Sequence, residues 1–254
     1  MRYPKLLWGY VGRYFLQWFA WRSFAFTLVA NQAVTPLIGL AVWTTALPGR
    51  NLSTYYVVLL FVRLVTVSYE EHTFSNRIYA GELADDLLRP HPVVLQPLGE
   101  NLALRVWHLL IGLPLLLGAL LLAPIELAGR NLALALPALL LAACLQFLLT
   151  YTLALSAFWS ERAHGITSLG STLIFLLGGE AAPVFLLPTS LRPLVAALPF
   201  RAMHGFPAEI AVGALSNAEM LAGYAGQGLW LGALLLIVRG VWRAGLRRYT
   251  AVGG

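Results

Sequence analysis

Six long apolar runs divide this chain, and each is close to the length that a helix needs to cross a lipid bilayer. A hydrocarbon core of about 30 Å is crossed by about 20 apolar residues in a helix. The runs cover residues 24–47, 52–69, 102–123, 132–159, 166–185 and 222–241. The sequence therefore predicts an all-α integral membrane protein with six transmembrane helices, built as a single domain over residues 1–254.

The first 22 residues follow a different pattern. Lys5, Gly9, Arg13 and Gln17 recur every four residues, and aromatic side chains occupy the other faces. This arrangement is typical of an amphipathic helix that lies in the membrane surface, with its cations toward anionic lipid. We predict such an interfacial helix over residues 1–22. The alternative is that these residues simply lengthen the first span.

Residues 183–213 are apolar, but prolines interrupt them too often for one continuous helix. The prolines are Pro183, Pro188, Pro193, Pro199 and Pro207. Irregular backbone at membrane depth persists only where it is buried in protein or lines a cavity. We therefore expect short extracellular re-entrant helices in this segment.

The composition agrees with a membrane protein. Hydrophobic residues make up 59% of the chain and charged residues only 11%, against roughly 25% charged residues in an ordinary soluble domain. The formal net charge is +6, but the basic residues flank apolar runs instead of gathering on one folded face. We therefore expect contact with membrane lipid and no binding of nucleic acid.

The distribution of lysine and arginine predicts the orientation, because these residues are enriched in short cytoplasmic loops. One set of flanks holds twelve of them and the other holds four, with Arg63 inside a span. The twelve are Arg2, Lys5, Arg13, Arg22, Arg77, Arg89, Arg105, Arg162, Arg239, Arg243, Arg247 and Arg248, and the four are Arg50, Arg130, Arg192 and Arg201. Both termini and residues 81–95 are therefore expected in the cytosol.

The most polar stretch of the chain is GELADDLLRPHPVVL, residues 81–95. Leucines fall at helical spacing, three carboxylates lie near the start where they suit the helix dipole, and prolines end the helix. The residues concerned are Leu83, Leu87 and Leu88, then Glu82, Asp85 and Asp86, then Pro90 and Pro92. We predict a short rigid helix that presents its charges to the cytosol. A solvated loop is the alternative.

Another polar connection, FWSERAHGITSL at residues 158–169, contains Glu161 and Arg162. These two side chains can pair with each other or with a partner protein. Connections this short are usually simple turns, so this pattern alone is weak evidence for a contact.

Four polar residues within or near the spans form a candidate path. Arg63 is the most costly of them, at roughly 2.5 to 3.5 kcal/mol on insertion scales if it is central, so we expect it to have a partner or an aqueous path. Asn31, Gln32 and Glu180 are candidates to share that path. Helix contacts are the alternative for the two amides, and hydration at the interface is the alternative for Glu180.

Catalytic motifs give little support to an enzyme, so we predict no catalytic residue and no metal site. Glu70, Glu71 and Arg77 resemble the glutamate-pair motif of an intramembrane protease, but the arginine follows after six residues where the motif has four. The five histidines form no HExxH pattern, and the chain contains neither GxSxG nor GxxxxGK[ST]. If the protein uses ATP, a partner must supply the site.

Three segments, in this order, resemble the six-helix permease subunits of ABC-2 type exporters, in the branch that pairs two permeases with one ATPase. They are GELADDLLRPHPVVL with the following LGENLALR, then FWSERAHGITSL, then PVFLLPTSLRPLVAALPF leading to FPAEIAVG. With the span count, the resemblance covers nearly the whole chain.

The resemblance implies a role for each segment. Residues 1–22 match the interfacial connecting helix, residues 81–92 the cytoplasmic coupling helix, residues 160–165 a smaller contact with the ATPase, and residues 183–213 the re-entrant helices. The implied coupling residues are Glu82, Asp85, Asp86, Leu87, Arg89, Pro90, Glu161 and Arg162. No motif of the family fixes the substrate contacts.

The resemblance also implies a function: the transmembrane subunit of an ATP-driven exporter in a bacterial cytoplasmic membrane. An ABC ATPase dimer would bind ATP and Mg²⁺, and a second permease would complete the path, with a heterodimer favoured over a homodimer. Members of the branch are linked to export of drugs and organic cations, and wider relatives to lipids, antibiotics or polysaccharides. An intramembrane hydrolase that uses Glu70 and Glu71, or a scaffold that does not transport, are the alternatives.

Overall fold

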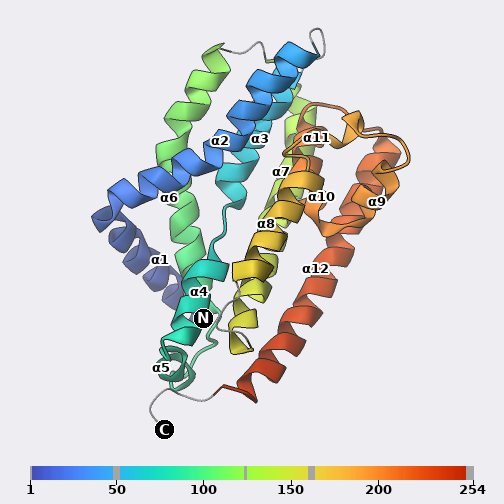
Figure 1. Ribbon diagram of the computed structural model, residues 1–254. Coiled ribbons are helices and arrows are strands. Elements are labelled where there is room, and N and C mark those ends of the chain that lie inside the picture. The colour runs from blue at the N-terminus through green and yellow to red at the C-terminus, as the bar shows by residue number, and fades with distance from the viewer. Residues whose placement is uncertain (1, 48–51, 123–124, 160–163, 250–254) are drawn as a thin grey trace.

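The computed structural model describes residues 2–47, 52–122, 125–159 and 164–249, and every regular element in these ranges is helical (Figure 1). The long helices are α1 (Arg2–Ala20), α2 (Arg22–Ala46), α3 (Leu52–Thr66), α6 (Leu95–Leu122), α7 (Gly129–Leu155), α8 (His164–Leu177) and α12 (Asn217–Leu246). The shorter elements are α4 (Glu70–Tyr79), α5 (Leu83–Leu87), η1 (Ser156–Phe158), η2 (Val184–Leu186), α9 (Arg192–Ala197), α10 (Pro199–Met203) and α11 (Gly205–Ala211).

Five stretches of the described chain are long and apolar enough to cross a membrane. They are Arg22–Ala46, Leu52–Tyr79, Leu95–Leu121, Gly129–Phe158 and Asn217–Leu246. The predicted all-α membrane fold is therefore confirmed, with five candidate spans. The predicted fifth span, residues 166–185, is a shorter helix, because α8 ends at Leu177 and Gly179 then adopts a φ of +86°, which favours glycine.

The second span, predicted over residues 52–69, is the helix α3, which starts at Leu52 and ends three residues early, at Thr66. A separate helix, α4, starts at Glu70 after three residues without helical structure. The break, residues 67–69, lines a cavity in the middle of the helix bundle.

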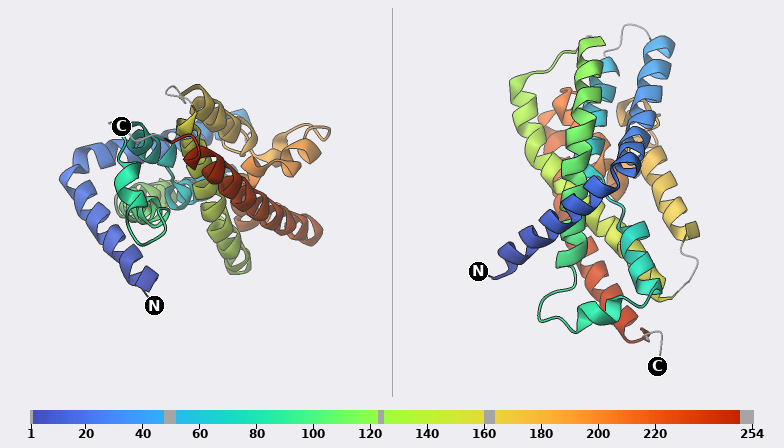
Figure 2. Two further views of the ribbon diagram at one scale, coloured as in Figure 1. Left: turned by 90° about the horizontal axis from the view of Figure 1, so that it is seen from below. Right: turned by 90° about the vertical axis from the view of Figure 1, so that its left-hand side faces the viewer.

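The N-terminal residues form a helix of their own. α1 is separated from α2 at Trp21, whose φ of −103° and ψ of 32° are not helical, and it leaves the bundle obliquely (Figure 2). It packs on α6, where Gly99 allows a close approach: a Cβ atom there would lie 2.5 Å from Cβ of Tyr10. Tyr10, Val11 and Tyr14 are buried in this contact. A separate amphipathic helix is thus present over these residues.

The other helices pack in two groups: α2 and α6 contact α3, and α7 contacts α12, α4, α11, α10 and α3. Toward one end of the bundle, Leu83 of α5 packs with Phe74, Ile78 and Tyr151. The chain after α12 meets this cluster, because Tyr249 donates a 2.9 Å hydrogen bond to the carbonyl of Gly81. The coupling segment, which we define as residues 81–92, therefore lies at the same end as the last turn of α12 (Figure 1).

One cation departs from the predicted distribution. Arg105 was assigned to a cytoplasmic flank, but it lies within α6 and its Nη2 donates a 2.7 Å hydrogen bond to the carbonyl of Ala143 in α7. Because Arg105 binds the neighbouring helix inside the bundle, it does not count as evidence for the orientation of the chain in the membrane.

Residues 183–213 form the short helices that the prolines predict. Pro193 and Pro199 occupy the first turns of α9 and α10, where a proline costs no helical hydrogen bond. α11 is buried along its whole length. These helices pack beside α12, in the half of the molecule away from α5 (Figure 1).

Candidate functional site

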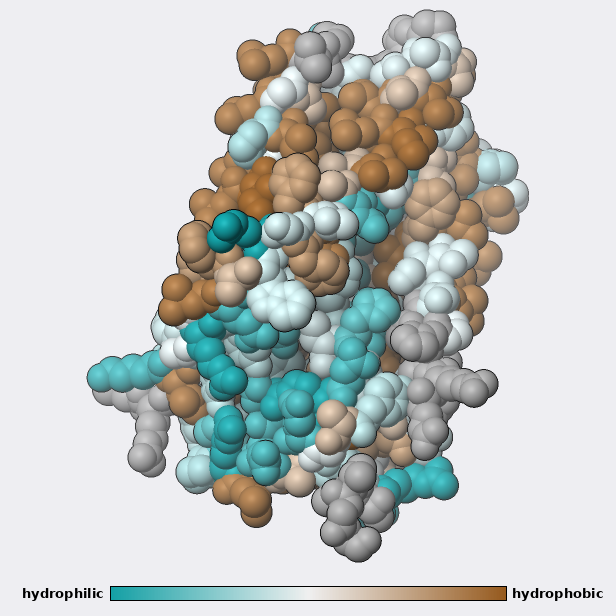
Figure 3. All heavy atoms as spheres, turned by 60° about the vertical axis from the view of Figure 1, so that its left-hand side comes forward, coloured by the Kyte–Doolittle hydropathy of each residue, from teal (hydrophilic) through white to brown (hydrophobic). Residues whose placement is uncertain are grey.

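A cavity of about 790 Å³ lies among α2, α3, α4, α7 and α8. Most of its lining side chains carry a hydroxyl, amide, imidazole or charged group. The polar lining consists of Asn31, Gln32, Thr35, Arg63, Thr66, Ser68, Tyr69, Glu71, His72, Thr73, Asn76, Gln146, Ser171, Thr172, Glu180 and His204. Figure 3 shows hydrophilic residues gathered over the lower part of one face of the molecule. A cavity this polar inside a membrane protein is typical of a substrate or ion path.

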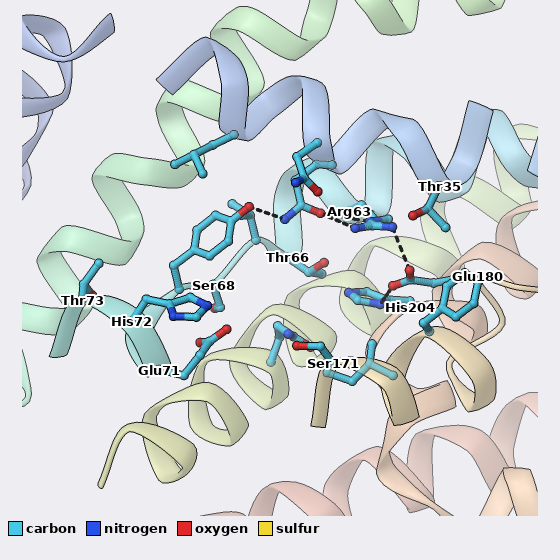
Figure 4. Close-up of a pocket in the computed structure, with 18 of the residues that line it drawn as sticks. Thr35, Arg63, Thr66, Ser68, Glu71, His72, Thr73, Ser171, Glu180 and His204 are labelled. Carbon is cyan, nitrogen blue, oxygen red and sulfur yellow. Dashed lines mark hydrogen bonds and ion pairs between the residues drawn. The ribbon is translucent and has the colours of Figure 1, made fainter. Parts of the chain in front are cut away.

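Arg63 lies at the centre of a polar network in this cavity (Figure 4). Its Nη1 is 2.7 Å from Oε2 of Glu180, and its Nε and Nη2 donate to Oε1 of Gln32 at 3.0 and 2.7 Å. Gln32 in turn donates to the hydroxyl of Tyr69 at 2.9 Å. On the other side, Nδ1 of His204 lies 2.7 Å from Oε1 of Glu180. The network joins α2, α3 and the chain after α8.

The four residues predicted to share a path all line this one cavity. Arg63 was expected to have a partner because an unpaired charge in a membrane is costly. Glu180 is that partner, and both side chains are mostly buried, at 12% and 6% exposed. Gln32 belongs to the network, and Asn31 lines the cavity next to it. The structure therefore brings these residues together; whether they contact a substrate stays a prediction.

Two buried acceptors in the cavity lining have no hydrogen-bond partner among the described residues. They are Oε2 of Glu71 and Oε1 of Gln146. A buried polar atom without a partner costs about 1 to 3 kcal/mol. Water or a ligand that donates hydrogen bonds in the cavity would remove this cost.

The helix break at residues 67–69 is held by α6. Asn101 donates to the carbonyl of Val67 at 3.1 Å, and Nε of Arg105 donates to the same oxygen at 3.2 Å. Asn101 also donates to the hydroxyl of Ser68 at 3.0 Å. Because backbone groups at membrane depth need partners inside the protein, these two side chains stabilise the break. α4 is thereby free to take a direction different from that of α3.

The two glutamates of the hydrolase alternative have different surroundings. Glu70 is buried, and its Oε2 accepts a 2.5 Å hydrogen bond from Thr150, whereas Glu71 lines the cavity. Within the described ranges, no group of three or more His, Cys, Asp or Glu side chains could hold a metal ion.

The coupling segment is fastened to α4 by an ion-pair cluster. Nη2 of Arg77, on α4, is 2.6 Å from Oδ2 of Asp86, and Nε of Arg77 is 3.2 Å from Oε2 of Glu82. Arg89 adds a third contact, 3.6 Å from Oδ1 of Asp86. α5 has only five residues, too few to be stable alone, so these contacts and buried Leu83 hold it in place.

One expectation about this segment is wrong. Asp86 was expected to present its charge to the cytosol, but its side chain is 2% exposed and faces Arg77. The helical phase explains this, because Asp86 lies three residues after buried Leu83 and shares its inward face. The exposed residues of the coupling segment are Glu82, Asp85, Leu87, Leu88, Arg89, Pro90 and Pro92, and Leu88 is the more exposed of the two leucines at 85%.

α1 contacts the coupling segment through Tyr10. Its hydroxyl lies 3.1 Å from Nε2 of His91 and accepts a 3.3 Å hydrogen bond from Arg89. This hydrogen bond, with Asp86 as a weaker cause, raises the pKa of Arg89 above its ordinary value. The helix α1 is therefore linked to the coupling segment. Glu161 and Arg162, the other predicted coupling residues, lie outside the described residues.

Several residues of the site were not predicted. Tyr69, Gln146 and His204 line the cavity, and Arg105 and Asn101 hold the break. Each is a polar residue in an apolar stretch. Because a polar side chain is costly inside a membrane, these positions could have been recognised in the sequence as candidate site residues. Their positions relative to one another depend on helix packing, which periodicity alone does not give.

Comparison with known proteins identifies the family. Residues 47–253 match the family described as ABC-2 family transporter protein. A comparison with curated proteins and one with solved structures found no match. Because the matched region is most of the chain, the protein belongs to the ABC-2 transporter family. It is a multi-pass membrane protein of the permease class, which generally forms the non-catalytic membrane component of a transporter and normally works with an ABC ATPase.

Proposed function

We propose that this chain is the transmembrane subunit of an ATP-driven exporter. In this proposal the coupling segment docks on a separate ABC ATPase, and the cavity around Arg63 is part of the substrate path. The termini and the coupling segment face the cytosol of a bacterium, across its inner membrane. The ATPase dimer binds ATP and Mg²⁺.

The observation that carries the proposal is the connection made by α4. This helix lines the cavity with Glu71, His72, Thr73 and Asn76. Its last turn holds the coupling segment through Arg77. A single ten-residue helix thus joins the candidate docking surface to the candidate path, and rigid elements of this kind transmit motion between sites.

The break at residues 67–69 supports a mechanism for this transmission. Displacement of the coupling segment by a closing ATPase would move α4 as a rigid body. The non-helical residues between α3 and α4 would absorb the change in direction, as hinge residues do. Glu71 and His72 would then move relative to Arg63 on α3 and change access to the cavity.

A second permease chain is part of the proposal. Asn31 on α2 and Ser171 and Thr172 on α8 line the cavity and are exposed, and polar surface is costly against lipid. A facing permease would cover it and complete the path. We favour a related second subunit over a second copy of this chain, following the paired arrangement of the branch that the sequence resembles.

The experiment is ATP-dependent uptake of a labelled substrate into inside-out membrane vesicles that contain the complex with its ATPase, because an exporter pumps into such vesicles. Asp85→Arg combined with Leu88→Asp changes only exposed side chains of the coupling segment, so we expect a folded protein with at least tenfold lower ATP-dependent transport. Arg243→Gln, an exposed arginine in the last turn of α12, is the control and should retain transport. Unchanged transport in the double variant contradicts the coupling assignment. Nucleotide-independent hydrolysis that is lost in Glu71→Gln would instead support the hydrolase alternative.

A further inference from the structure

The central cavity, the one around Arg63, ends at one level of the helix bundle. On α2 the last residue that lines it is Thr35, on α3 the first is Arg63, and after α8 the lining residue is Glu180. Figure 4 shows these three residues together at one side of the cavity, away from His72 and Thr73. Among the described residues, none of α2 beyond Thr35 and none of α3 before Arg63 lines the cavity. The cavity is therefore closed at this end.

The cavity opens in the opposite direction, toward the coupling segment. His72 and Asn76 of α4 line it and are exposed, and α4 leads directly to the coupling segment. In the proposed function, a second permease covers the remaining side, between α2 and α8. The cavity is thus open at the coupling end and closed toward the half of the molecule that contains α9 to α11 (Figure 1).

The closed end is bridged by residues 178–183, which we call the strap. The strap joins α8 to η2 and is not helical. Its backbone is tied to α2, because Nε1 of Trp43 donates to the carbonyl of Ala181 at 2.9 Å. It is also tied to α3, because the hydroxyl of Tyr55 donates to the carbonyl of Gly179 at 2.8 Å. Tyr56 adds a longer hydrogen bond, 3.5 Å, to the carbonyl of Ala181.

An aromatic layer fills the space beyond the strap, about two turns of α3 away from Arg63. Tyr55 contacts Tyr56 and Phe185 edge to face, with ring centroids 5.3 and 5.9 Å apart. Tyr55 and Tyr56 are 0% and 1% exposed. The ring of Tyr56 packs directly on α2, since it would overlap a Cβ atom at Gly39. This layer blocks a passage between α2 and α3.

The charge of the strap fastens it from inside the cavity. Oε2 of Glu180 lies 2.7 Å from Nη1 of Arg63 on α3, and Oε1 lies 2.7 Å from Nδ1 of His204, between α10 and α11. The strap is therefore held by hydrogen bonds on one side and by ionic contacts on the other. Because a hydrogen bond is lost when donor and acceptor separate beyond about 3.5 Å, a small shift of the strap breaks these contacts together.

The helix α8 is the element that can carry such a shift. It packs on α7 and α10, and its exposed side chains cover a broad face. They are Ser168, Leu169, Ser171, Thr172, Phe175 and Leu176. Segments with few buried contacts move at a lower free-energy cost than the core of a protein. A displacement of α8 would pull directly on the strap.

We propose that the strap is a gate. In the state described here it closes the central cavity toward the α9 to α11 half. Its release from Trp43, Tyr55 and Arg63 joins the cavity to that half, as a segment with two discrete arrangements can do. For an exporter this is the outer gate. The direction of opening rests on the proposed function, whereas the closure itself does not.

The test is the rate at which a membrane-impermeant maleimide labels a cysteine in place of Thr35, just inside the strap. The complex with its ATPase is held without nucleotide in right-side-out membrane vesicles, and the chain carries Cys144→Ser because Cys144 is its single cysteine. We expect slow labelling of Thr35→Cys while the strap is intact. Trp43→Phe combined with Tyr55→Phe removes two hydrogen bonds to the strap and should raise the rate at least tenfold.

Two further variants complete the test. Glu180→Gln removes the ionic contacts of the strap and should also raise the rate at least tenfold; the aromatic double variant keeps the test decisive if Glu180→Gln does not fold. The matched control is Tyr224→Phe combined with Trp230→Phe. It removes the same kinds of hydrogen bond, to the carbonyls of Leu134 and Ala197, and should leave the rate unchanged.

Three outcomes overturn the proposal: fast labelling with the strap intact, an unchanged rate in the folded strap variants, or an equal increase in the control. In inside-out vesicles, every variant should be labelled equally fast through the open end of the cavity. Labelling that depends on the strap only in inside-out vesicles would support the gate but reverse the orientation in the proposed function. The two failures are therefore distinguishable.

Discussion

Arg77 on α4 lies 2.6 Å from the carboxylate of Asp86, whose side chain is only 2% exposed. This pair fastens the coupling segment to the helix that lines the central cavity. The same guanidinium also contacts Glu82, which is 58% exposed. Arg77 therefore makes one buried ion pair, with Asp86, and one solvated ion pair, with Glu82. Loss of the buried pair should lower the stability of the protein more than loss of the solvated pair.

Removal of Arg77 should destabilise the coupling end of the protein. Arg77→Gln leaves the carboxylate of Asp86 buried with only Arg89 nearby, and loss of one partner of a buried ion pair costs about 3 kcal/mol. Glu82→Gln removes only the solvated contact and should cost less than about 1 kcal/mol. Thermal unfolding in detergent measures both. Equal losses in the two variants would show that Asp86 does not depend on Arg77.

The pair of Arg63 and Glu180 should be energetically coupled. A double-mutant cycle of Arg63→Gln and Glu180→Gln should give a coupling free energy of about 1 to 3 kcal/mol, because contacting groups in one network are not additive. Glu209 pairs with Arg201 instead, so Arg63→Gln combined with Glu209→Gln should be additive. Unfolding of the full chain in detergent reads out both cycles. Additivity in the first cycle would contradict the ion pair.

Gly99 should be intolerant of a side chain. A Cβ atom there would lie 2.5 Å from Cβ of Tyr10 and 3.3 Å from the backbone nitrogen of Val11, so Gly99→Ala forces α1 away from α6 at a cost of about 1 to 3 kcal/mol. Gly118, in the same helix, has open space around it, and Gly118→Ala should be neutral or stabilising. Proteolysis of α1 measures its release. Equal resistance in the two variants would mean that α1 is not held at Gly99.

Arg105 should be required for the helix break. Arg105→Met removes the donors to the carbonyls of Val67 and Ala143, and a buried acceptor left unpaired costs about 1 to 3 kcal/mol. Hydrogen exchange around residues 67–71 should become faster. Val106→Met, a change at the exposed neighbouring residue, serves as the control. Exchange unaffected by Arg105→Met would place the support of the break elsewhere.

The sequence predicted the elements that depend on local pattern. Apolar run lengths gave the membrane helices, and prolines such as Pro193 and Pro199 gave the short helices after α8. The end of α3 was predicted three residues late, at Tyr69 instead of Thr66, because Val67 and Tyr69 extend the apolar run. The donors on α6 explain why residues 67–69 are not helical. The end of α8 was missed because residues 178–185 remain apolar apart from Glu180.

The sequence predicted several residues of the candidate site, but not how they are arranged in space. The cost of a charge in a membrane singled out Arg63, and the same reasoning gave Gln32 and Glu180 as companions. His204 was not predicted, since its proximity to Glu180 arises from the packing of α10 against α8. Asp86 was placed on the wrong side of α5, because five residues of helix are too short for periodicity alone to fix the buried face.

The docking of the coupling segment is tested most directly by site-specific cross-linking from Leu88. In a full-length Cys144→Ser protein assembled with its ATPase, Leu88→Cys with a photo-activatable label should form a covalent adduct with the ATPase. The same label at Leu121, which is 87% exposed near the other end of α6, should form none. An ATPase adduct from Leu88 alone is the predicted result. An assembled complex without that adduct, or labelling of Leu88→Cys in whole cells by a membrane-impermeant reagent, would contradict the account.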